Sequence, residues 1–115
     1  MNTTIVPIPT NLISDWPSFH KVFSEALGFP TFYGATMDAW IDCMTCADEP
    51  EAQMLASQVR PGELLTLQID DTSNFAVRCP EQFKALVECA AFVNYRRVEI
   101  GGRPVLSLLM SRHFS

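Results

Sequence analysis

Basic residues are scarce in this sequence, and most of its first half has none. The chain has eight Lys and Arg against 13 Asp and Glu, and no basic residue lies between Lys21 and Arg60. Residues 1–60 carry seven acidic side chains and two basic ones, whereas residues 61–115 carry six of each. This composition argues against a nucleic-acid partner, because phosphate binding needs clustered Lys and Arg. The asymmetry favours a basic partner instead.

The sequence also lacks a long apolar run. No stretch approaches the roughly 20 apolar residues of a membrane-spanning helix, and the N-terminal MNTTIVPIPTN has no basic start or apolar core typical of a signal peptide. We therefore expect a cytoplasmic protein. With 115 residues, 48% of them hydrophobic and 18% charged, the chain is expected to form a single domain, residues 1–115, without disulfide or metal staples.

Motifs for catalysis, redox chemistry or metal binding are weak. Cys43 and Cys46 form a CxxC pair, but they fall at the end of an expected helix, whereas a reactive thiolate is stabilised at a helix N-terminus. A closed zinc site needs two further ligands, and Cys79 and Cys89 do not form a second CxxC. We interpret all four cysteines as ordinary reduced thiols. We expect no enzymatic activity, no cofactor and no metal.

Both histidines, His20 and His113, are interpreted as surface residues, since no GxSxG or similar nucleophile motif accompanies them.

The hydrophobic pattern predicts an α/β fold in which strands alternate with helices. Predicted strands cover residues 4–7, 64–69 and 105–110, and these three could be parallel. A first helix follows the capping pair Ser14-Asp15 and ends at Gly28, a second of about ten residues follows Thr36, and a third covers residues 81–93. A turn is predicted at residues 70–74 and a short helix at residues 52–59. The Gly101-Gly102 turn further predicts a C-terminal hairpin, with strands on both sides of the two glycines.

The second predicted helix has an apolar stripe and an acidic flank. The stripe, spaced i, i+3, i+4, i+7, consists of Met37, Trp40, Ile41 and Met44 and is expected to be buried. The flank consists of Asp38, Asp42 and Thr45. Like charges at i, i+4 weaken a helix by a few tenths of a kcal/mol.

The two aspartates have three interpretations. They can form a solvated helix face, an acid–base or cation-binding pair, or a surface for a basic partner. No histidine or phosphate loop nearby supports the second. The acids of the following loop, Asp48, Glu49 and Glu51, are expected mainly to speed association with a basic partner. For Phe32 and Tyr33, in the connector before the helix, burial and a partner interface stay equally open.

The stretch SDWPSFHKVFSEALGFPTFYGATMDAWIDCMTC, residues 14–46, resembles the barstar family of ribonuclease inhibitors. The shared features are a helix opening with Ser-Asp, a connector containing Pro-x-aromatic-Tyr-Gly, and a helix containing Asp-Ala-x-x-Asp-Cys-x-Thr. The resemblance implies a small three-stranded parallel sheet packed with helices. It also implies an intracellular immunity protein, monomeric when free, which blocks the active site of a basic, secreted, barnase-like ribonuclease with acidic side chains.

Matched residue by residue, the resemblance assigns partner binding to the connector and the second helix. The implied interface residues are Phe32, Tyr33, Gly34, Thr36, Asp38, Asp42 and Thr45. This sequence departs from the family pattern at four positions. Phe32 replaces a tyrosine, Ala35 a glutamate, Thr36 an asparagine and Ile41 a tryptophan. A family glutamate on the later helix has only an approximate counterpart in Glu88. The alternative function is a barstar-like interaction module whose partner is not a ribonuclease.

Overall fold

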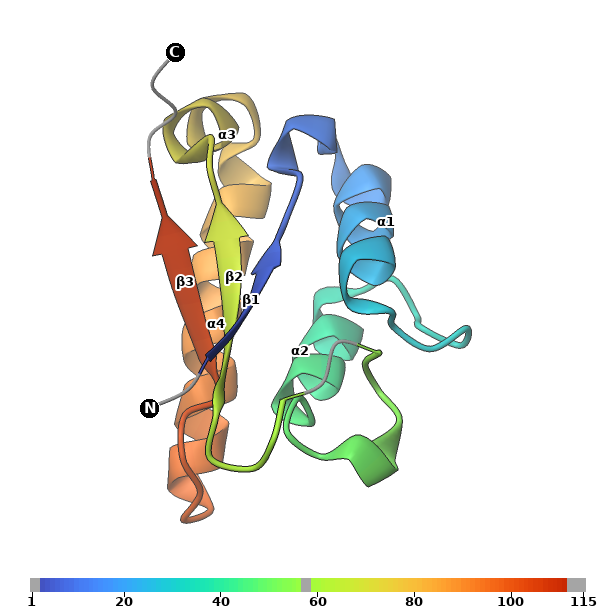
Figure 1. Cartoon of the computed structure of the whole chain (residues 1–115). Helices are drawn as coiled ribbons and strands as arrows, with labels where there is room; N and C mark the ends of the chain where they lie inside the picture. Colours follow the sequence, from blue (N-terminus) through green and yellow to red (C-terminus); the bar gives the residue numbers. More distant parts are fainter. Residues whose placement is uncertain (1–2, 57–58, 112–115) are drawn as a thin grey trace.

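Three parallel strands form the centre of the fold (Figure 1). The computed structural model describes residues 3–56 and 59–111. The strands lie in the order β1-β2-β3 and cover Thr3–Pro7, Leu64–Ile69 and Leu106–Met110. In the shared register Leu65 of the central strand lies opposite Thr4 and Leu106. The predicted α/β fold with a parallel three-stranded sheet is confirmed.

Four α-helices connect and cover the strands. Their bounds are Trp16–Leu27 (α1), Met37–Thr45 (α2), Thr72–Arg78 (α3) and Pro80–Glu99 (α4), with 3₁₀ turns at Thr10–Leu12 (η1) and Pro50–Ala52 (η2). The predicted caps are present. Asp15 accepts a hydrogen bond from the Ser18 amide at the start of α1, and Thr36 accepts one from the Ala39 amide at the start of α2.

The C-terminal strand is present, but its predicted hairpin partner is wrong. Residues 96–99 are the last turn of α4, and the glycine turn after them returns the chain to β3, which pairs in parallel with β2. The apolar residues of the predicted partner strand, Val98 and Ile100, are both exposed. The neighbouring Arg97 instead holds the helix end by side-chain bonds to α2 and the following loop, so long-range contacts override a local β preference.

Two smaller predictions also need correction. Residues 70–74 do not form only a turn, because α3 begins at Thr72 and fills the short path from β2 to α4. In place of the helix predicted at residues 52–59, the chain forms the 3₁₀ turn η2, and Gln53 then leaves helical geometry with a φ of 55°. Residues 57 and 58 lie outside the described residues.

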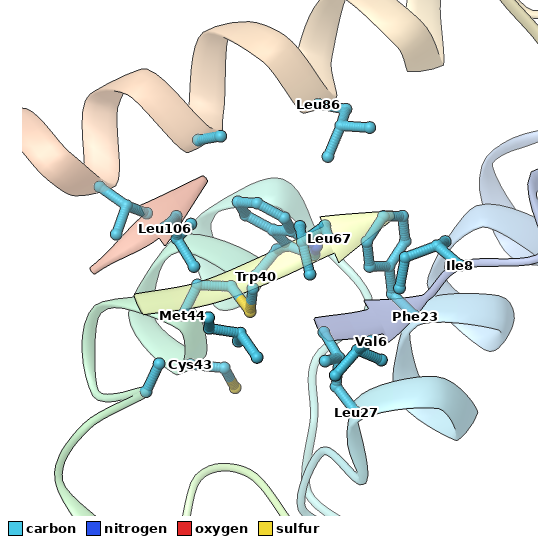
Figure 2. Packing of buried hydrophobic residues seen from close by; sticks show 14 of the residues in the cluster. Val6, Ile8, Phe23, Leu27, Trp40, Cys43, Met44, Leu67, Leu86 and Leu106 are labelled. Atoms are coloured by element: carbon cyan, nitrogen blue, oxygen red, sulfur yellow. The ribbon is translucent and has the colours of Figure 1, made fainter. Parts of the chain in front are cut away.

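The core lies between one face of the sheet and the helices. Figure 2 shows core side chains converging from β1, β2, β3, α1, α2 and α4. The predicted stripe of α2 is confirmed as core: Trp40 and Met44 are fully buried, Ile41 is buried, and Met37 packs against them. Trp40 meets Phe23 of α1 edge to face, with ring centroids 5.8 Å apart. The acidic flank of α2 is thereby turned outward.

No helix in the described part of the chain combines the length and apolar character needed to cross a membrane.

Candidate functional site

The seven residues assigned to partner binding lie on the connector between α1 and α2 and on α2 itself, and we call them the connector–α2 surface. Thr36 caps α2, and Asp38, Asp42 and Thr45 follow at helical spacing, so these side chains share one flank. Gly34, Thr36, Asp38 and Asp42 are exposed, and Thr45 is partly buried. The flank is accessible to another molecule.

Phe32 and Tyr33 have different environments. Phe32 is 73% exposed, whereas Tyr33 is partly buried and packs against Phe29 with ring centroids 4.6 Å apart. The Tyr33 hydroxyl lies 2.6 Å from His20 Nδ1, and burial raises the pKa of this hydroxyl. Phe32 is therefore free to contact a partner, while Tyr33 also anchors the connector to α1.

His20 is a buried residue, so its interpretation as a surface histidine is wrong. It is 6% exposed, lies between Trp16 and Phe19, and is hydrogen-bonded to Tyr33. Burial lowers the pKa of the imidazole, which therefore stays neutral at pH 7. The sequence did contain a signal, because His20 falls four residues after Trp16, at the spacing of one helix face. His113 lies outside the described residues.

Ala35 gives the connector an unusual backbone. Its φ of 53° is in the left-handed region that residues with a Cβ rarely adopt. Such conformations cost on the order of 1 kcal/mol or more and persist where the surrounding structure holds them. Here the next residue begins the cap of α2, and the Tyr33 contacts fix the chain just before it. The connector is therefore held in one shape before a partner arrives.

Asp42 has an ion-pair partner, although none could be found near it in the sequence. Arg96 Nη1 of α4 lies 3.4 Å from Asp42 Oδ1, and the side chains are 43% and 63% exposed, respectively. In the described residues Asp38 makes no such pair. The absence of any basic residue between Lys21 and Arg60 predicts that both aspartates are unpaired, which holds for Asp38 among the described residues and is wrong for Asp42. No sequence signal predicts the contact, because 54 residues separate its members.

Asp48 is a buried structural residue, so the expectation that it speeds association as a free loop acid is wrong. Arg97 of α4 donates to both of its carboxylate oxygens at 2.8 Å, and the side chains are only 13% and 8% exposed. The same guanidinium donates to the Thr45 carbonyl and the Arg103 carbonyl. This bidentate arginine fixes the end of α2 against α4. Glu49 and Glu51 remain exposed.

The cysteines have the character expected of ordinary thiols. All four are free, with Cys43 and Cys79 buried and the other two partly buried. Burial raises the pKa of both Cys43 and Cys46 to about 11, so the CxxC pair is protonated at neutral pH. Within the described residues no cluster of His, Cys, Asp and Glu is arranged to hold a metal ion.

A groove at the carboxyl ends of β1 and β2 offers no better site. Of its two acidic residues, Asp71 accepts a hydrogen bond from Thr10 and faces Arg78 at 3.6 Å, and Asp70 accepts one from Gln68. Arg78 in turn donates to the Thr10 and Ile13 carbonyls. These polar groups already link α3 to η1, so they hold the fold together and leave the connector–α2 surface as the candidate site.

Comparison with known families identifies the family of this chain. A family model described as Barstar (barnase inhibitor) matches residues 3–101, which include every strand and helix except β3. The chain therefore belongs to the barstar family, whose members are inhibitors rather than enzymes. No curated protein matches the sequence.

Proposed function

We propose that this protein is a cytoplasmic immunity protein that inhibits a basic, secreted ribonuclease by covering its active site with the connector–α2 surface. The observation that carries the proposal is the exposed pair Asp38 and Asp42 on one flank of α2, in a chain that belongs to a family of barnase inhibitors. The free protein is a monomer and uses no cofactor.

The chemistry of the flank suits a ribonuclease active site. An enzyme that cleaves RNA holds phosphates with cationic side chains, and exposed carboxylates can take the place of those phosphates. Arginine in particular binds carboxylate and phosphate with the same bidentate geometry. Phe32, exposed at the tip of the connector, adds apolar area beside the charges. Substrate access is blocked because inhibitor and RNA need the same cations.

The second candidate is an interaction module whose partner is not a ribonuclease. The observation that favours it is the Asp42–Arg96 pair, which makes the surface less uniformly acidic than a phosphate mimic requires. Both functions use the same residues, so they differ in the partner alone.

An RNA-cleavage assay separates the two. Barnase and any basic ribonuclease encoded beside this gene are titrated with the purified protein, and we expect inhibition to saturate at one inhibitor per enzyme. The Asp38→Ala, Asp42→Ala double variant should lose most of this inhibition. A Glu25→Ala, Glu51→Ala variant is the matched control, because it removes two exposed acids outside the surface.

Loss of inhibition in the control to the same extent would show that net charge, and not the surface, is responsible. If neither enzyme is inhibited and the protein used as bait recovers a partner without nuclease activity, the interaction-module function replaces the ribonuclease one.

A further inference from the structure

Arg96 occupies an unexpected position for a protein that binds a basic partner. It extends from α4 toward α2, where its Nη1 lies 3.4 Å from Asp42 Oδ1. Its guanidinium carbon lies over the ring of Phe92, 5.9 Å from the ring centroid. It thus places a positive charge on the acidic flank itself.

The two aspartates of the flank are therefore not equivalent. Asp38 is exposed and has no ion pair among the described residues, so an approaching cation meets it directly. Asp42 is already in contact with Arg96, and a second cation reaches it only by displacing the guanidinium or by sharing the carboxylate with it. Both side chains of the pair are about half exposed, so the contact is weak enough to exchange.

We infer that Arg96 is an internal competitor for the partner's cation at Asp42, and so a specificity-determining residue of the connector–α2 surface. This inference rests on the proposed function for the identity of the partner. A partner with a well-placed arginine can displace Arg96 through a bidentate bond, whereas a diffuse cation or a single lysine gains little over the pair already present. Arg96 thereby reduces binding to basic molecules in general and retains binding to a partner of matching geometry.

Arg97, the next residue, cannot have this role. Its guanidinium is buried and bonded to Asp48, Thr45 and Arg103, so it is not available to exchange with a partner. Within the described part of the chain the Arg96 guanidinium contacts Asp42 and the ring of Phe92 and no backbone acceptor, so its removal leaves the buried bonds of Arg97 in place. Arg96→Met, which keeps most of the side-chain length over Phe92, isolates the charge.

The test uses hexa-arginine as a probe that does not depend on any ribonuclease. Its affinity is measured by NMR titration for the parent, for Arg96→Met and for Lys21→Met. The last variant loses the same charge from an exposed site on α1 and controls for net charge. Because an exposed ion pair is worth at most about 1 kcal/mol, we expect Arg96→Met to bind the peptide about two- to fivefold more tightly than Lys21→Met.

In the Asp42→Asn background this gain should vanish, since there is then no carboxylate to compete for. Equal affinities of Arg96→Met and Lys21→Met would overturn the inference. Weaker binding by Arg96→Met would overturn it too, because Arg96 would then contribute a contact instead of competing. Titrating barnase with the same variants tests the proposed function separately: no binding by any variant contradicts that function, while the peptide result still decides the role of Arg96.

Discussion

Arg96 and Arg97 are neighbours in the chain, and each pairs with an aspartate, but the first pair is exposed and the second is buried. Arg96 makes an exposed pair with Asp42, of the kind that contributes between zero and about 1 kcal/mol. Arg97 makes a buried, bidentate pair with Asp48 that also ties down the end of α2. Removing one member of a buried pair leaves an uncompensated charge in the interior.

Asp48→Asn should therefore lower the free energy of unfolding by about 3–5 kcal/mol, the usual cost of breaking a buried pair. Glu51→Gln, in the same loop but exposed, should change it by less than about 0.5 kcal/mol. Urea denaturation of the two variants measures the difference. Similar midpoints for both would contradict the burial of Asp48 and its pair with Arg97.

His20 should make stability depend on pH. Its pKa is lowered from 6.5 by burial, so below about pH 6.5 the unfolded chain takes up a proton that the folded chain resists. The stabilisation associated with the neutral ring is complete above that pH and is lost as the pH falls toward the lowered pKa. Urea unfolding at pH 7.5 and 5.5 should show lower stability at the acid pH.

The matched variants for this effect are His20→Gln and Lys21→Gln, the latter at the exposed neighbouring residue on α1. The first should reduce the pH dependence and the second should retain it. If His20→Gln retained the full pH dependence of stability, titratable groups other than His20 would be responsible for it.

The chain is tightly constrained at the end of α1. Gly28 caps the helix with a φ of 67°, and a Cβ there would lie 2.3 Å from the Cβ of Ala56. The Ala56 amide also donates to the Leu27 and Gly28 carbonyls, so the approach is fixed by backbone bonds. Gly101 has a φ of 85°, but a Cβ there would meet nothing within 4 Å.

Gly28→Ala should accordingly destabilise the protein by more than Gly101→Ala, which carries only the left-handed strain of roughly 1 kcal/mol. The additional loss of stability in Gly28→Ala, compared with Gly101→Ala, measures the steric clash with Ala56. It should be at least about 1 kcal/mol, as for overpacking in a dense interior. Thermal unfolding of the two variants measures it, and equal losses would refute the close approach.

Elements that depend on local pattern could be predicted from the sequence. The capping residues Asp15 and Thr36, the glycine after α1 and the apolar alternation of β2 each encode their element within a few residues. Elements decided by distant contacts could not. The last turn of α4 has β-branched residues but is held as helix by Arg97 bonding to α2 and its following loop. The same limit applies to α3, whose single fully buried residue, Phe75, gives too short a pattern.

At the scale of the whole molecule, the fold places α2 beside α4, and this placement decides which charges the surface carries. The surface residues were predicted from the family resemblance and from the long stretch of sequence that has no basic residue. The sequence could not predict Arg96 at Asp42 or Arg97 at Asp48, because charge counts along a chain do not show which charges meet in space. The flank of α2 is therefore acidic, but Arg96 makes it less negative than the sequence suggested.

The central claim is that Asp38 and Asp42 are the anchors through which this protein binds a basic ribonuclease. Stopped-flow binding to the candidate enzyme, at several salt concentrations, tests it most directly. The account predicts that added salt slows association, because screening shortens the range of steering to roughly 8 Å at physiological ionic strength. It also predicts that Asp42→Ala dissociates faster, because enzyme cations are left unpaired, while its own thermal stability barely changes. An Asp38→Ala, Asp42→Ala variant that binds and inhibits as well as the parent would contradict the account.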